Sequence, residues 1–164
     1  MLDTTNRYCV ICHKEITIPE LPTIHYDGGA AHPSCYYGHR DWQQDVAAFH
    51  QRFGIPIRFK PQLASSDRRH LRTKLHREEY EELWEAMSSG NITEIADGIA
   101  DLIYVLLGTA IEYGININPI WDEVQRTNML KEGGGIRPDG KILKPEGWLS
   151  PDIAGILKQQ GWKG

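Results

Sequence analysis

Apolar residues recur every three or four positions through most of the chain beyond residue 40, a spacing that places them on one face of a helix. Glycine, proline and capping residues mark where these stretches begin and end. The predicted helices are about Asp41–Phe53, Asp67–Met87, Ile92–Tyr113, Pro119–Leu130 and Pro151–Gln160. The N-terminal caps expected for the last four are Ser66, Asn91, Asn118 and Ser150, with Gly90 and Gly114 ending the second and third helices. No stretch here alternates convincingly with period two, so the pattern predicts an all-α fold, a helical bundle of about four main helices.

The first 38 residues have a different pattern, without helical periodicity. They contain all three cysteines, a turn region at residues 19–22 with a proline at each end, and the Gly28-Gly29 pair. We therefore expect two domains: a small module at residues 1–38 that contains a short β-hairpin, and a helical domain at residues 39–164.

The small module carries two short pairs of potential metal ligands. Cys9 and Cys12 form a CxxC motif, and nineteen residues later His32 and Cys35 form an HxxC motif. Two ligand pairs on tight turns suit tetrahedral Zn²⁺, and thiolate-rich ligation selects this ion. The pattern resembles one half of a LIM-type or treble-clef module, so we predict a structural zinc site whose metal supplies the folding energy of a segment too short for its own core. The alternative is that the cysteines are free or buried by coincidence.

Composition narrows the class of partner. The chain has 164 residues, of which 40% are hydrophobic and 24% charged, as in ordinary soluble domains. Its net charge of −4 and the few basic residues of the first region do not favour nucleic acid as a partner. No apolar leader or membrane span is evident, and an odd number of cysteines suits a reducing compartment, so we expect a cytoplasmic protein that does not bind membranes.

Acidic residues gather on the second and third predicted helices. Glu79 and Glu82 are three residues apart and point the same way, with Glu78 beside them, whereas Asp97 and Asp101 are four apart on the next helix. The apolar run after Asp101 suggests that this carboxylate faces the interior, where it is costly unless it is paired or bound to a metal.

Carboxylates that meet across two helices repel one another, and a divalent cation removes that penalty. A site of oxygen ligands alone selects a hard ion, so we predict catalytic Mg²⁺ or Mn²⁺. The alternative is that these residues are solvated faces of amphipathic helices, which we favour for Glu81 and Glu85. Glu94 is equally well explained as a ligand or as part of a capping box with Asn91.

The sequence Glu78-Glu79-x-x-Glu82-Leu83, followed by Asp101-Leu102-Ile103-Tyr104, resembles the EExxE…ExxD signature of the MazG-like pyrophosphohydrolases. That superfamily includes phosphoribosyl-ATP pyrophosphohydrolases and dimeric dUTPases. Residues 45–54, 127–131 and 139–145 also resemble its first helix and C-terminal segment in phage-type and bacterial members, so the likeness covers about residues 41–153. The chain departs from the pattern at Gly98, where the family often has glutamate, and Asp97 is expected to take that role.

The resemblance implies an enzyme that hydrolyses nucleoside triphosphates to the monophosphate and pyrophosphate. The Mg²⁺ ligands would be Glu79, Glu82, Asp97 and Asp101. A glutamate, Glu78 or Glu79, would orient water or take its proton. Candidate substrate contacts are His50, Asn128, Lys131, Lys141 and Lys144.

Base specificity and assembly are implied less directly. Phage-type relatives that remove dGTP make dGTP the first candidate substrate. Phe49, His50, Phe53 and Trp84 are possible walls of the base pocket, although Phe49 and Phe53 are better explained as core residues. The resemblance also implies a homodimer or homotetramer. Two other functions remain open: phosphoribosyl-ATP hydrolysis, and a non-enzymatic zinc-finger adaptor.

Overall fold

The structure is a computed structural model that describes residues 24–26, 29–31 and 41–164. The chain divides into two compact units, residues 1–41 and 42–164. In the first unit, strands β1 (Ile24–Tyr26) and β2 (Gly29–Ala31) pair antiparallel, with Ile24 opposite Ala31, in agreement with the expected hairpin. The predicted zinc ligands lie outside the described residues, so the zinc site stays a prediction. They are Cys9, Cys12, His32 and Cys35.

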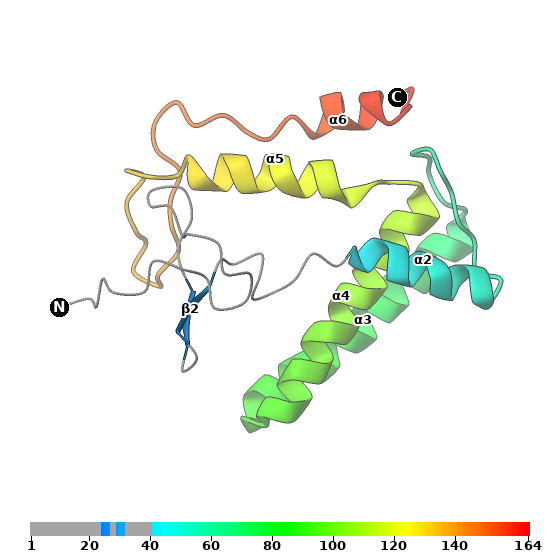
Figure 1. The fold of residues 1–164 in the computed structure, drawn as a ribbon, viewed down its shortest axis with the longest axis horizontal. Helices are drawn as coiled ribbons and strands as arrows, with labels where there is room; N and C mark the ends of the chain where they lie inside the picture. The colour runs from blue at the N-terminus through cyan, green and yellow to red at the C-terminus, as the bar shows by residue number, and fades with distance from the viewer. Residues whose placement is uncertain (1–23, 27–28, 32–40) are drawn as a thin grey trace. The chain divides into compact units, whose positions relative to one another are not determined.

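Residues 42–164 contain five α-helices (Figure 1). They are α2 (Trp42–Arg52), α3 (Ser66–Ser89), α4 (Ile92–Tyr113), α5 (Ile117–Met129) and α6 (Ile153–Gln159). The two longest, α3 and α4, pack along each other, α2 packs across α4, and α6 runs beside α5. This arrangement confirms the expected all-α helical fold. In the described part of the chain, no helix is both long and apolar enough to cross a membrane.

The ends of α3 and α4 follow from local capping. Gly90 and Gly114 end these helices in the left-handed conformation, with φ of 71° and 70°, which glycine adopts without the steric penalty of a side chain. Asn91 caps α4 as expected, since its side-chain oxygen accepts from the backbone N–H groups of Thr93 and Glu94. The cap of α3 is Ser65 rather than Ser66, because the Ser65 hydroxyl is the group that accepts from the backbone of the first turn.

Two later helix starts differ from the prediction. Helix α5 begins two residues early because Asn116, and not Asn118, caps it by accepting from the Asn118 N–H at 3.1 Å. Pro119 is tolerated as its third residue because the first turn of a helix leaves its N–H groups without intrahelical partners. Helix α6 begins after Asp152 rather than Ser150, because the Asp152 carboxylate accepts from the Gly155 N–H at 2.8 Å.

An ion pair is buried where α2, α3 and α4 meet. Glu112 of α4 is 0% exposed, and Arg68 of α3 donates to both of its carboxylate oxygens, at 2.7 and 2.5 Å. Arg72 lies 3.6 Å from the same carboxylate and also donates to Thr109 and to the Val105 carbonyl. This network satisfies a charge that would be very costly if it were buried alone.

The phenylalanines of α2 are not core residues, contrary to the expectation. Phe49 and Phe53 are 40% and 61% exposed. Their rings contact each other, at 4.5 Å between centroids, and Phe49 also meets the edge of Tyr104 at 5.6 Å. The face of α2 that turns inward is instead the one with Val46 and His50, each 2% exposed.

Candidate active site

The two acidic helices approach each other most closely at a glycine. Gly98 of α4 is buried, and a Cβ placed on it would lie 3.1 Å from the Cα of Leu83 on α3. Even a Cβ at this position would be a tight contact that Leu83 could accept only by moving a few tenths of an ångström. The contact therefore brings α3 and α4 close together beside the clustered carboxylates.

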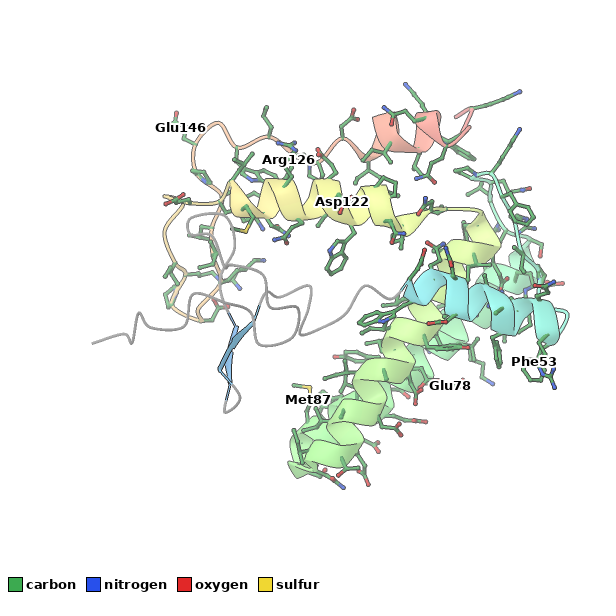
Figure 2. All side chains as sticks on the ribbon, in the orientation of Figure 1. Phe53, Glu78, Met87, Asp122, Arg126 and Glu146 are labelled. Carbon is green, nitrogen blue, oxygen red and sulfur yellow. The ribbon has the colours of Figure 1, made fainter. Side chains whose placement is uncertain are left out.

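The predicted carboxylates surround this contact. Glu79 and Glu82 lie on α3 and Asp97 and Asp101 on α4, while Glu78 (labelled in Figure 2) lies beside Glu79. Partial burial, and after it the negative charges of Glu82, Asp101, Glu78 and Asp97, raise the pKa of the Glu79 carboxyl above its ordinary value. Four predicted neighbours thus act together on one side chain, because none of them offsets the charge of the others.

The exposure of these residues corrects one expectation. Asp101 is exposed rather than directed into the interior, although the residues that follow it, Leu102 and Ile103, are half-buried. Asp101 lies one turn after Gly98 and so falls at the edge of the contact with α3. The carboxylate that is fully buried on α4 is Glu112, which the sequence analysis did not single out.

The donor set fits a hard divalent cation. All the clustered side chains are carboxylates, which supply the oxygen ligands that Mg²⁺ and Mn²⁺ prefer. As they are placed in residues 41–164, no three His, Cys, Asp or Glu side chains stand close enough together to ligate one ion.

Glu94, the other candidate ligand, lies in the first turn of α4. Its backbone N–H donates to the side chain of Asn91 at 3.5 Å, so the position acts in the helix cap. The clustered charges that raise the pKa of Glu79 include Asp97 and not Glu94, which favours Asp97 as the fourth member of the set.

The structure separates the candidate substrate residues. His50 is 2% exposed, and its Nδ1 lies 3.2 Å from the Pro56 carbonyl oxygen. Burial lowers the pKa of its imidazole, which is the behaviour of a core histidine. Asn128 lies near the end of α5 with an exposed side chain.

Two of the three candidate lysines come together after α5. The ammonium groups of Lys131 and Lys144 lie 5.9 and 4.1 Å from the centre of the Trp148 ring. Lys141 lies apart from them, in a turn with Arg137 and Asp139. Trp148 was not among the residues expected from the sequence; it comes four residues after Lys144, just beyond the segment 139–145 that resembles the family.

A comparison with known families assigns the part of the chain that contains these helices. Residues 46–128, which are 83 of the 164 residues, match the phosphoribosyl-ATP pyrophosphohydrolase family. The chain belongs to this family, which is part of the MazG-like all-α nucleotide pyrophosphohydrolases. No curated protein matches the chain. The matched span includes every clustered carboxylate and ends before Lys131.

Proposed function

We propose that the protein hydrolyses nucleoside or deoxynucleoside triphosphates to the monophosphate and pyrophosphate, with Mg²⁺ or Mn²⁺ as cofactor. The observation that carries the proposal is the group of like charges around Glu79, which, after partial burial, raise the pKa of its carboxyl. Like charges gathered on two packed helices destabilise the protein when no cation is present, and a ligand that carries a cation with a polyphosphate removes that cost. The family to which the chain belongs supports the same class of reaction.

Each carboxylate has a proposed role. Glu79, Glu82, Asp97 and Asp101 would hold the ion, which when bound would offset the charge of the triphosphate and lower the pKa of a bound water. In the reaction, the water oxygen bonds to the α-phosphorus, the bond to the bridging oxygen breaks, and pyrophosphate leaves. Glu79 or Glu78 would take the proton from the water.

Glu79 and Glu78 differ in their suitability as the base. The raised pKa of Glu79 suits a base, because partial burial and then the neighbouring negative charges make its carboxylate bind a proton more readily. Glu78 is exposed and forms an ion pair with the Lys74 ammonium group, at 3.5 Å.

The substrate is the part of the proposal with least support from the site. We propose dGTP as the first candidate. The family description names phosphoribosyl-ATP, which offers the same phosphoanhydride to the carboxylates and is the second candidate. A non-enzymatic zinc-finger adaptor is the third, and the clustered carboxylates weigh against it, since an adaptor has no need of them.

Exposed apolar side chains support assembly as a homodimer or homotetramer. The α3–α4 pair exposes large residues that a lone chain would leave in water. They include Tyr80, Trp84, Met87, Ile99 and Leu106, which are 59%, 59%, 63%, 47% and 50% exposed. Large apolar residues exposed on neighbouring helices are typical of protein contacts, and a second copy would cover them. For the first 38 residues we propose structural Zn²⁺ held by Cys9, Cys12, His32 and Cys35.

The decisive experiment measures pyrophosphate release from each common NTP and dNTP and from phosphoribosyl-ATP, with Mg²⁺, with Mn²⁺ and without either ion. Divalent ions should be removed by dialysis rather than by a chelator, because a chelator would also take the predicted zinc. Release that depends on the ion is expected for at least one substrate, and the panel ranks the candidates.

Variants test the residues. Asp101→Ala and Glu82→Ala should abolish ion-dependent turnover, a loss of at least about a hundredfold, while the helical circular dichroism spectrum is retained. Glu81→Ala is the matched control, because Glu81 is an exposed acidic neighbour of Glu82 on the same helix. Near-normal activity in both Asp101→Ala and Glu82→Ala would overturn the proposal.

A further inference from the structure

The segment after α5 folds back on itself and brings two distant lysines together. Gly134 makes this possible: a Cβ on it would lie 2.0 Å from the Leu143 carbonyl oxygen, so only glycine fits. The Leu143 N–H donates to the Gly135 carbonyl at 3.0 Å, and Ile136 pairs with Ile142 as an isolated antiparallel bridge. Lys131 and Lys144 lie just outside this closure, one on each arm.

The far end of the same closure is a tight turn. Arg137 donates to both carboxylate oxygens of Asp139, and its backbone N–H donates to the Lys141 carbonyl at 2.8 Å. The turn is therefore fixed by its own hydrogen bonds, and the path of both arms is set before any ligand is present.

Trp148 joins the closed segment to helix α5. Its indole Nε1–H donates to the Thr127 carbonyl at 2.8 Å, and Thr127 is 1% exposed. The backbone N–H of Trp148 donates to the Pro145 carbonyl at 3.2 Å. The ring is thus held between the last turn of α5 and the arm that carries Lys144.

Both lysine ammonium groups lie within the range of a cation–π interaction with this one ring, at 4.1 Å for Lys144 and 5.9 Å for Lys131. In residues 41–164, neither ammonium group forms an ion pair with a carboxylate. Both ammonium groups are positively charged, and the negative face of the indole attracts each of them. Each ammonium group has three N–H donors, and the ring face does not use them all.

We propose that Trp148 is a positioning residue, which holds the ammonium groups of Lys131 and Lys144 as a pair that binds the polyphosphate of the nucleotide. The inference rests on the proposed function and adds to it a residue that orders two candidate phosphate-binding lysines. A pair of cations suits a group with several negative charges and is a poor match for a single carboxylate.

The test combines substitutions at the ring and at the lysines. Trp148→Leu removes the aromatic face, and Trp148→Phe keeps a face but loses the Nε1–H bond to Thr127. A second set begins from Lys131→Gln with Lys144→Gln and adds Trp148→Leu to that background. Lys158→Gln on α6 is the control for loss of one surface charge. The measurements are KM and kcat for the best substrate, and the dissociation constant of inorganic tripolyphosphate by calorimetry with Mg²⁺.

Trp148→Leu should raise both KM and the tripolyphosphate dissociation constant by about tenfold, with a smaller change in kcat, because two cation–π contacts are lost. Trp148→Phe should show a smaller rise. In the background without the two lysines, Trp148→Leu should cause no further rise, because the ring would act only through them. A merely structural tryptophan would add its full effect in that background, and this result would overturn the inference.

The design separates the two proposals. If no nucleotide is hydrolysed, the proposed function fails, while tripolyphosphate binding still judges the role of Trp148. If hydrolysis is normal and Trp148→Leu leaves both KM and tripolyphosphate binding unchanged, the inference alone fails. Should Trp148→Leu not fold, Trp148→Phe and the lysine variants decide by the same comparison.

Discussion

Helices α3 and α4 carry carboxylates in two opposite settings. Near the C-terminal end of α4, Glu112 is fully buried and is bound by two arginines of α3. Earlier on the same helix, Asp97 and Asp101 are exposed and share their surroundings with the glutamates of α3, which raises the pKa of Glu79. The first setting is neutralised within the chain, and in the second the negative charges of Glu82, Asp97 and Asp101 act on Glu79. The environment of a carboxylate, and not its presence on a helix, separates a structural role from a functional one.

The largest expected effect on stability concerns the buried carboxylate. Glu112→Ala leaves Arg72 buried without its partner and should lower the free energy of unfolding by about 3–5 kcal/mol. Asp101→Ala should change it by less than about 0.5 kcal/mol, because the side chain is exposed. Urea denaturation of both variants measures the contrast, and equal losses would show that the two settings do not differ.

Divalent cations should stabilise only the second setting. At about a hundred times its dissociation constant, Mg²⁺ should raise the free energy of unfolding of the wild-type protein by about 2.7 kcal/mol. Asp101→Ala should lose most of this gain, whereas Glu81→Ala should keep it. Thermal unfolding with and without Mg²⁺ measures the shift, and an equal gain in Asp101→Ala would place the ion elsewhere.

Removing one of the like charges should give a smaller gain when no divalent ion is present. The raised pKa of Glu79 means that protonation favours the folded state. Its contribution is therefore present below the ordinary pKa of 4.5 and is lost as pH rises through the folded value. Glu79→Gln should then be more stable than the wild type at neutral pH, by about 0.5 kcal/mol, and turnover should be lost.

Thermal unfolding of Glu79→Gln and the wild type, measured near neutral pH and again well below pH 4.5, checks the sign. The advantage of the variant should shrink at the lower pH. A constant difference across this range would mean that the charge of Glu79 is not what destabilises the site.

The smallest expected effect concerns Glu123 of α5. Its hydrogen bonds with Arg126 and with the Asp152 N–H lower the pKa of its carboxyl to about 2. Its stabilising contribution is therefore present above the ordinary pKa of 4.5 and is lost as pH falls towards 2. Glu123→Gln should remove this acid dependence. Denaturation of both proteins on either side of pH 4.5 measures it, and parallel pH profiles would contradict the assignment.

The fold could be predicted largely because its signals are local. Asn91 and Gly114 bound α4 at the expected residues, since a side-chain cap and a left-handed glycine act within one turn. The start of α5 was placed late because the proline at its third position was taken as the first. Exposure was harder to predict: Phe49 and Phe53 fit an apolar stripe, yet which side of α2 meets α4 depends on tertiary packing.

The candidate site divides in the same way. Residue spacing was enough to group Glu79 with Glu82, and Asp97 with Asp101, because each pair shares a helix face. Residue spacing could not show that Glu112 pairs with Arg68, which is 44 residues away in the sequence. Nor could it show that the chain folds back at Gly134 and brings Lys131 and Lys144 to the ring of Trp148. Contacts between residues far apart in the sequence depend on the tertiary fold, and the periodicity of the sequence does not predict them.

The contact between Gly98 and Leu83 has a consequence for engineering. Beside the acidic cluster, α3 and α4 meet through the backbone of Gly98 and the Cα and Cβ of Leu83, which are uncharged. We therefore expect that the side chains at positions 79, 82, 97 and 101 can be substituted without changing the spacing of α3 and α4.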